Sequence, residues 1–133
     1  MQNNISVQAK LGMRQYQVVL TTANHSLIAD EPQSKGGANT GPTPDELVAM
    51  ALSACTSITL RMYAEHKNWN LGTINVQTTM IRHEDGTQTF ERVISVEHQF
   101  DEATMTRLLN VANKCPVHKT LSRGNTINST FKI

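Results

Sequence analysis

Three short stretches near the start of the chain alternate apolar and polar residues. This pattern is typical of strands, and it predicts them at about 4–10, 13–21 and 25–30. The Gly- and Pro-rich stretch DEPQSKGGANTGPTP then breaks the alternation and predicts a surface loop. The chain therefore begins with a run of strands rather than with strands alternating with helices.

A long helix is predicted over residues 44–67. Thr43 suits the N-cap, Pro44 the first helical position, and Glu46 the third position of a capping box. From residue 47 to 63 the segment is apolar or small around most of its circumference, so we expect it to be covered on more than one side. Arg61 and several hydroxyl side chains interrupt the apolar run, and we therefore do not expect this helix to cross a membrane.

The second half of the chain predicts a hairpin and two further helices. Alternation over 74–80 and 94–100 flanks the Asp-Gly of HEDGTQ, which favours a tight turn between paired strands. Asp101 suits the N-cap of a second helix, and Pro116 suits the first turn of a short third helix at about 116–121. TINSTFKI predicts a last strand.

The resulting order β-β-β-α-β-β-α-α-β predicts an α+β fold, with residues 1–133 forming a single domain. The 12 basic and 11 acidic residues are spread along the chain, so nothing suggests a nucleic-acid partner. The first residues, MQNNISVQAKLG, do not resemble a secretory signal, and we expect a cytoplasmic protein. In that compartment thiols stay reduced, which favours catalytic, redox-active or metal-binding cysteines over a structural disulfide.

The two cysteines have different surroundings in the sequence. Cys115 directly precedes Pro116, so it is expected near a helix N-terminus, where unpaired N–H groups and nearby Lys and His side chains favour the thiolate. Cys55 lies about three turns into the long helix, too deep for the helix dipole to help much. Cys115 could equally be a small buried residue, because free cysteine is often buried. For Cys55, the helix alone favours a small core residue over a reactive thiol.

Two other types of site remain open at this point. Cys115 and His118 have a spacing that can place two ligands on one zinc ion, with Cys55 as a third. A Cys-His hydrolase is a further alternative, but no orienting Asn or Asp and no nucleophile elbow can be identified.

Two motifs together resemble a known family. GGANTGPTPDELVAMALSAC, followed about sixty residues later by ANKCPVHKTLSRGN, is similar to the OsmC/Ohr family of thiol-dependent peroxidases, and especially to an OsmC-like branch with a Cys-Pro-Val-His second motif. The resemblance implies an intertwined homodimer in which long central helices are packed by the sheets of both chains. It also implies that no cofactor is needed.

The resemblance further implies a role for each site residue. Cys55 would attack the hydroperoxide and become a sulfenic acid, and Cys115 would resolve it into a disulfide. Arg14 falls where the family has the arginine that activates the first cysteine, and Asp45 falls where the family has the acid that orients this arginine, with Glu46 as the neighbouring candidate. An external dithiol would then reduce the disulfide.

The sequence thus predicts a peroxidase that reduces organic hydroperoxides, and hydrogen peroxide less efficiently, in defence against oxidative stress. One alternative is a non-catalytic redox sensor or ligand-binding protein of the same fold. A zinc-binding protein using both cysteines is the other.

Overall fold

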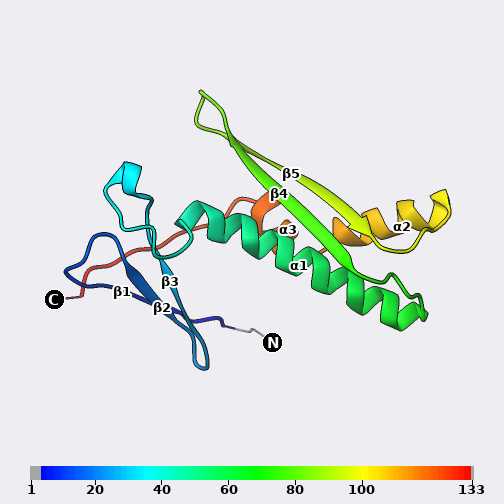
Figure 1. Cartoon of the computed structure of the whole chain (residues 1–133), viewed down its shortest axis with the longest axis horizontal. Coiled ribbons are helices and arrows are strands. Elements are labelled where there is room, and N and C mark those ends of the chain that lie inside the picture. The colour runs from blue at the N-terminus through cyan, green and yellow to red at the C-terminus, as the bar shows by residue number, and fades with distance from the viewer. Residues whose placement is uncertain (1–3, 133) are drawn as a thin grey trace. The chain divides into compact units, whose positions relative to one another are not determined.

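The computed structural model describes residues 4–132 and confirms the α+β class (Figure 1). Within these residues, three α-helices accompany a three-stranded and a two-stranded antiparallel sheet. The chain divides into two compact units, residues 1–48 and 49–133, with the boundary inside the long helix.

The first unit contains the three-stranded sheet, which is antiparallel and in the order β1-β2-β3. Its strands are β1 (Gln8–Leu11), β2 (Val18–Thr21) and β3 (Ser26–Ala29). All three lie inside or close to their predicted ranges but are shorter, because the ladder joins only four residues of each strand.

The prediction of a strand over the whole of 13–21 was wrong. Residues 13–17 form the connection between β1 and β2 instead, and Arg14 lies in this turn, exposed. The backbone N–H of Tyr16 donates to a carboxylate oxygen of Asp30 at 3.0 Å. Because this N–H is bonded to a side chain, it is not available to pair with a neighbouring strand, and the residues do not form a strand despite their alternating pattern.

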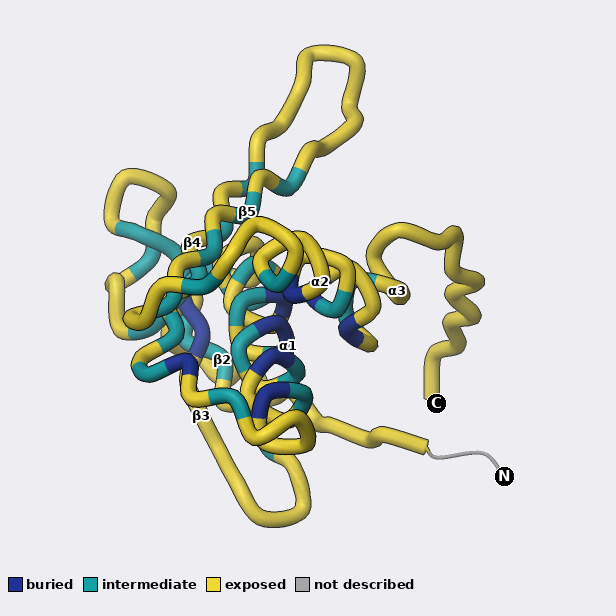
Figure 2. Tube along the Cα trace, turned by 90° about the vertical axis from the view of Figure 1, so that its right-hand side faces the viewer, coloured by how far each residue is buried: buried dark blue, intermediate teal, exposed yellow. Residues whose placement is uncertain are grey.

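Helix α1 (Pro44–Lys67) has the predicted bounds and the predicted cap. The N–H of Thr43 donates to the Glu46 carboxylate at 2.8 Å, and the N–H of Glu46 donates to the Thr43 hydroxyl at 3.1 Å. A single stripe of the helix is buried, and Figure 2 shows its dark blue turns. This stripe consists of Leu52, Thr56, Leu60 and Ala64. Its spacing of four residues is that of one helix face.

The rest of α1 is less covered than its composition led us to expect. Met50, Ile58 and Met62 are 51%, 54% and 65% exposed in the chain by itself. We also expected α1 to have too little continuous apolar length to cross a membrane, and this expectation was wrong. An 18-residue window of the helix has a mean hydropathy of 1.4, so the helix is long enough and apolar enough for a membrane span. The same length and composition also occur in core helices, and the buried stripe of α1 contributes to the core described below.

The hairpin consists of β4 (Ile74–Arg82) and β5 (Gln88–Val96), joined by a turn over 83–87 that contains the Asp-Gly. The pairing is continuous from Ile74 opposite Val96 to Arg82 opposite Gln88. The second strand therefore begins earlier than predicted, and His98 and Phe100 lie beyond its end. Along β5 the half-buried positions are Phe90, Arg92, Ile94 and Val96.

The two shorter helices follow as predicted. Helix α2 (Glu102–Ala112) is capped by Asp101, whose carboxylate accepts from the Thr104 N–H at 2.9 Å. Helix α3 (Pro116–Ser122) begins at the predicted proline. The core of the second unit joins α1, α2 and the start of the hairpin, and its buried members are Leu60, Ala64, Leu71, Leu108 and Ala112.

The predicted last strand is absent from residues 126–132, and the final residue lies outside the described part of the chain. Ile127 is 86% exposed and Phe131 is fully exposed. A strand is stabilised by pairing with a neighbour. None of the described strands pairs with this segment, so its alternating pattern alone does not make it a strand.

Candidate functional site

Cys115 occupies the N-cap of α3, as the sequence predicted. Its sulfur accepts a hydrogen bond from the backbone N–H of His118 at 3.3 Å. The residue is fully buried, with no measurable exposure of its side chain. The Cys-Pro pair produces this geometry, because the proline fixes the first turn of the helix and the residue before a proline prefers an extended backbone.

Cys55 lies in the middle of α1 and is only half-buried. Its sulfur is 4.0 Å from the Thr59 hydroxyl oxygen one turn later in the helix. The Cys55 thiol lies near enough to Cys115 to be one of the groups that lower the pKa of the Cys115 thiol, and both thiols are free. The fold therefore brings together two cysteines that lie far apart in the sequence.

Thr56 connects the two cysteine-bearing segments. It directly follows Cys55 and is fully buried, and its hydroxyl donates to the Leu52 carbonyl at 2.7 Å. The hydroxyl oxygen also lies 3.8 Å from the sulfur of Cys115. A buried threonine in the apolar stripe of α1 thus has a polar partner on each side.

Arg92 projects from the half-buried face of β5 and makes four hydrogen bonds. One terminal nitrogen, Nη1, donates to the Thr56 hydroxyl at 2.9 Å and to the Ala112 carbonyl at 3.3 Å. The other, Nη2, donates to Asn113 Oδ1 at 2.8 Å and lies 3.1 Å from Nδ1 of His118. A guanidinium can only donate, so Nδ1 of His118 is the acceptor and carries no proton in this contact.

These contacts affect the charge state of Cys115. Burial raises the pKa of its thiol, but the hydrogen bonds from the His118 N–H, the Thr56 hydroxyl and the Cys55 thiol lower it. The positive charge of Arg92 acts in the same direction, and the pKa of Cys115 is lowered overall. Cys115 therefore loses its proton more readily than an ordinary thiol does.

The same arginine keeps His118 neutral. Burial lowers the pKa of His118, and the charge of Arg92 lowers it further. The neutral ring then accepts from Arg92 instead of competing with it as a second cation. His118 is thus a hydrogen-bond partner of Arg92 and not a second source of positive charge.

The remaining predicted site residues belong to the first unit. Arg14 lies in the turn between β1 and β2, and Asp45 and Glu46 lie exposed in the first turn of α1. The carboxylate of Glu46 caps its own helix through the N–H of Thr43. The expectation that Arg14 and Asp45 serve Cys55 stays a prediction.

Sequence reasoning missed Arg92, although a signal was present. The position falls in register with Phe90, Ile94 and Val96, so it lies on the apolar face of a strand. A charged residue on such a face needs a polar partner inside the protein. Extending the alternation of β5 backward by two residues would have identified Arg92 as a candidate.

The zinc alternative gains no support from the geometry. Among residues 4–132, no group of three or more His, Cys, Asp and Glu side chains is arranged to hold a metal ion. His118 directs Nδ1 to Arg92, which occupies one of its two possible ligand atoms.

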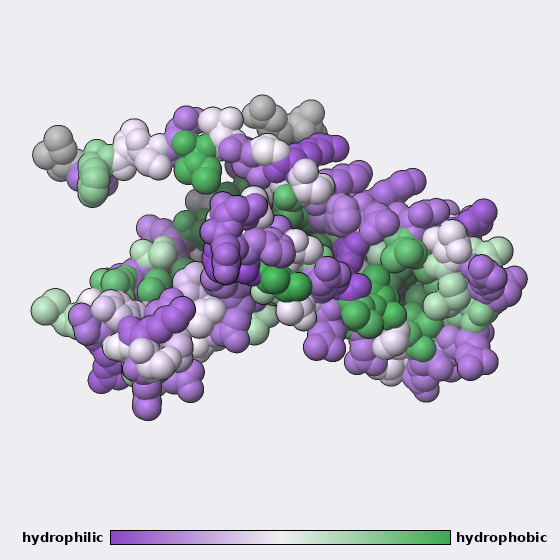
Figure 3. All heavy atoms as spheres, turned by 90° about the horizontal axis from the view of Figure 1, so that it is seen from above, coloured by the Kyte–Doolittle hydropathy of each residue, from purple (hydrophilic) through white to green (hydrophobic). Residues whose placement is uncertain are grey.

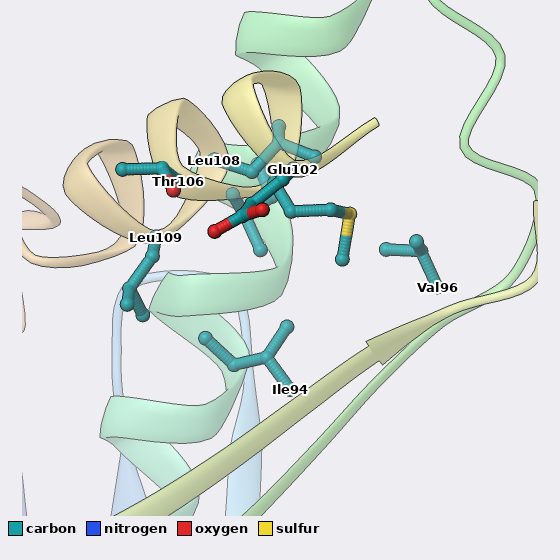
Figure 4. A pocket seen from close by; sticks show the side chains of 8 residues that line it. Ile94, Val96, Glu102, Thr106, Leu108 and Leu109 are labelled. Carbon is teal, nitrogen blue, oxygen red and sulfur yellow. The ribbon is translucent and has the colours of Figure 1, made fainter. Parts of the chain in front are cut away.

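Two of the hollows on the second unit are lined in part by residues of β5. One, of about 330 Å³, lies beside the arginine network and is lined by Leu52, Phe90, Arg92, Leu109, Asn113, His118, Leu121 and Ser122. The other, of about 320 Å³, is mostly apolar and lies between α2, β5 and α1 (Figure 4). Figure 3 shows apolar side chains gathered around a hollow over α2. No cysteine lines either hollow.

Comparison with known proteins identifies the family. The model of the OsmC-like proteins matches residues 36–130, which include both cysteines and Arg92. The chain belongs to the OsmC-like family. No curated protein matches it significantly.

Solved structures of OsmC-like proteins share the fold. A protein of Psychrobacter arcticus, named as a putative osmotic stress induced and detoxification response protein, is 18% identical, with 90% of each chain covered and a TM-score of 0.77. An OsmC-like protein of Mycoplasma pneumoniae is also 18% identical, with 92% of this chain and 89% of that chain covered and the same TM-score of 0.77. The organic hydroperoxide resistance protein OhrB of Bacillus subtilis is 25% identical, with 92% of this chain and 93% of that chain covered and a TM-score of 0.61.

Proposed function

We propose that this OsmC-like protein is a thiol-dependent peroxidase that reduces organic hydroperoxides, and hydrogen peroxide less efficiently, through a two-cysteine cycle. The observation that carries the proposal is the proximity of two free thiols, one half-buried and one fully buried, together with the hydrogen bonds and the Arg92 charge that lower the pKa of the buried one. The similarity to an organic hydroperoxide resistance protein over most of both chains supports a redox role in stress defence.

Exposure assigns the first step to Cys55, because a hydroperoxide in solution reaches a half-buried thiol before a fully buried one. The Cys55 thiolate attacks the outer oxygen of the hydroperoxide, and the O–O bond breaks. The departing alkoxide takes up a proton and leaves as an alcohol. Cys55 is then a sulfenic acid, oxidised by two electrons.

The second step uses the lowered pKa of Cys115. Its thiolate attacks the sulfur of the sulfenic acid, an S–S bond forms, and the S–O bond breaks. The leaving hydroxide takes up a proton to become water. Condensation with a second thiol protects Cys55 from further, irreversible oxidation.

A dithiol completes the cycle in this proposal. One of its thiolates attacks the disulfide to give a mixed disulfide, and its second thiolate releases both cysteines in reduced form. Attack at the more exposed sulfur, that of Cys55, leaves the buried Cys115 as the departing thiolate. A thiol with a low pKa is a good leaving group, so the lowered pKa of Cys115 also favours this step.

The proposal is tested by following consumption of an organic hydroperoxide with a dithiol or a monothiol as reductant. We expect sustained turnover with the dithiol and little with the monothiol. Cys55→Ser should reduce turnover to the rate without protein, and mass spectrometry of this variant should find no oxidised Cys115 after one equivalent of peroxide. Ser57→Ala, a nearby change on α1, serves as the control. First oxidation at Cys115 would reverse the proposed roles, and slow turnover with intact disulfide formation would favour the redox-sensor alternative.

We also propose that the protein is a homodimer. The face of α1 that carries Met50, Ile58 and Met62 is apolar and exposed in the single chain. Covering these side chains would remove apolar surface from water, which favours association. Sedimentation at micromolar concentration should give the mass of two chains, and Met62→Glu should shift the protein toward one chain. A wild-type protein that sediments as a single folded chain would contradict the proposal.

A further inference from the structure

Arg92 is placed where it can hold both cysteine-bearing segments. Its guanidinium reaches Thr56, the residue directly after Cys55, through Nη1 at 2.9 Å. It also reaches both sides of Cys115: the Ala112 carbonyl and the Asn113 side chain precede that cysteine, and His118 follows it. One side chain from β5 thus joins α1, the end of α2 and α3.

The four acceptors of this guanidinium are all neutral. They are a hydroxyl, a backbone carbonyl, a side-chain amide oxygen and a neutral imidazole nitrogen. Arginine stays protonated in proteins, and none of these four acceptors neutralises its positive charge. Cys115 is the group in this network that can supply the opposite charge.

Thr56 transmits the contact between Arg92 and Cys115. A hydroxyl has one hydrogen, which Thr56 gives to the Leu52 carbonyl in the structure. When Cys115 loses its proton, the hydroxyl can turn this hydrogen toward the sulfur, 3.8 Å away, while its oxygen still accepts from Arg92. Donation from a cation into the hydroxyl oxygen strengthens the hydroxyl as a donor.

We propose that Arg92 is the positioning residue of the disulfide-forming step. It holds α1 against the α2–α3 junction so that the Cys115 thiolate faces Cys55 once Cys55 has been oxidised. The place of this step in a peroxidase cycle rests on the proposed function. The positioning itself rests on the hydrogen bonds of Arg92 and applies to any oxidation of Cys55 that leaves a displaceable group on its sulfur.

The experiment uses the reduced protein and the aromatic disulfide dithiobisnitrobenzoate, so it does not depend on peroxidase activity. The Cys55 thiolate attacks the reagent, forms a mixed disulfide and releases one coloured thiolate. Cys115 then attacks the Cys55 sulfur of the mixed disulfide, the protein disulfide forms, and a second coloured thiolate leaves. Stopped-flow absorbance separates the two releases, and Cys115→Ser assigns them by abolishing the second.

Arg92→Gln should leave the rate of the first release unchanged and slow the second at least about tenfold, since a displacement of about 1 Å can cost a hundredfold in rate. Its second release should also require higher pH than in the wild type, because Cys115 loses a neighbouring positive charge. Arg107→Gln is the matched control: it removes the same charge from an exposed position on α2, and both rates should stay at the wild-type value.

Arg92→Lys separates charge from geometry and covers the case in which Arg92→Gln does not fold. The lysine ammonium keeps the positive charge, but its single nitrogen cannot reach the four acceptors that the two guanidinium nitrogens of Arg92 reach. We expect the pH midpoint of the second release to stay near the wild-type value and its rate to remain slow. Wild-type rates for the second release in either variant, or a wild-type protein that releases a single equivalent, would overturn the inference. Two releases that depend on Arg92 in a protein without hydroperoxide turnover would sustain the inference and refute the proposed function instead.

Discussion

In each unit of the protein, a buried or half-buried charged side chain forms several hydrogen bonds with neutral partners, and the two cases differ in the reactivity of those partners. In the first unit, the buried carboxylate of Asp30 accepts from the N–H groups of Tyr16 and Glu31 and from both the N–H and the hydroxyl of Thr40. In the second unit, the half-buried guanidinium of Arg92 donates to four neutral acceptors. The two charges have opposite signs, but both side chains form several hydrogen bonds with neutral groups.

The difference lies in the reactivity of the neighbours. The partners of Asp30 are backbone groups and a threonine hydroxyl, which do not ionise near neutral pH. The Thr40 hydroxyl, against the opposing effect of burial, and the backbone N–H groups of Thr40, Glu31 and Tyr16 hold the pKa of Asp30 well below its ordinary value. Arg92, by contrast, acts on two groups that ionise near neutral pH, Cys115 and His118. The comparison suggests a structural role for the carboxylate and a chemical role for the guanidinium.

The largest expected effect comes from removing the reactive neighbour of Arg92. Cys115→Ser should still allow one oxidation of Cys55, but dithiol-dependent turnover should fall by at least about two orders of magnitude, because the disulfide cannot form. A sulfenic-acid trap should label Cys55, and excess peroxide should add a second oxygen, detected by mass spectrometry. Wild-type turnover in this variant would show that Cys115 takes no part in the cycle.

The next effect tests whether the first unit contributes only structure. Arg14→Ala should slow the reaction with hydroperoxide about tenfold or more, because an opposite charge near a thiolate is generally worth one to three orders of magnitude in its formation. Reduction of the disulfide by dithiol should change far less. Arg14→Lys should recover part of the rate, since it keeps the charge without the planar fork. Equal losses in both half-reactions would assign Arg14 to folding instead.

A smaller effect concerns the pH dependence of Cys115. Its pKa is lowered in the folded protein, so alkylation of a Cys55→Ser variant, in which the His118 N–H, Thr56 and Arg92 remain, should have its midpoint below the ordinary value of a thiol. The rate should fall as pH drops through that midpoint and level off above it. Unfolding the variant in denaturant should return the midpoint to the ordinary value. A midpoint at or above the ordinary value in the folded variant would mean that burial outweighs the polar contacts.

The smallest effect on activity is expected at Asp30. Asp30→Asn keeps the shape but removes the charge, so the protein should melt at lower temperature while the rate of hydroperoxide reduction stays within about twofold. Because the folded pKa is lowered, the stability supplied by the carboxylate is present above the unfolded value of about 3.9 and is lost as pH falls through the folded value. The difference in melting temperature should therefore be constant near neutral pH and shrink below about pH 4. A strong loss of activity in a stable Asp30→Asn variant would show that Asp30 also contributes to the reaction.

The elements that the sequence predicted well are those with local signals. The capping box at Thr43 and Glu46 marks the start of α1, Asp101 marks the start of α2, and Pro116 marks the start of α3. Each signal is a contact between residues a few positions apart, so it can be recognised without the fold. The placement of Cys115 at a helix N-cap followed from the same kind of local argument.

The predictions that failed depended on distant partners. Residues 13–17 alternate like a strand, but the Asp30 carboxylate takes the N–H of Tyr16 from fourteen positions away. The segment over 126–132 also alternates, and no described strand lies beside it. A strand needs a neighbour, and alternation within a segment says nothing about where that neighbour is.

By itself, the sequence determined the α+β class, the bounds of the long helix and the presence of two cysteines, because these follow from local hydrogen bonds and from composition. Only the tertiary structure decided that Arg92 joins Thr56, the residue after Cys55, to residues on both sides of Cys115. Thr56 lies on the buried stripe of α1, and Arg92 lies on the half-buried face of β5. Their meeting depends on how the hairpin packs against the helices, which no spacing along the chain reveals. The pKa of Cys115 was decided in the same way, since it depends on the balance between burial, hydrogen bonds from α1 and α3, and the charge of Arg92 on β5.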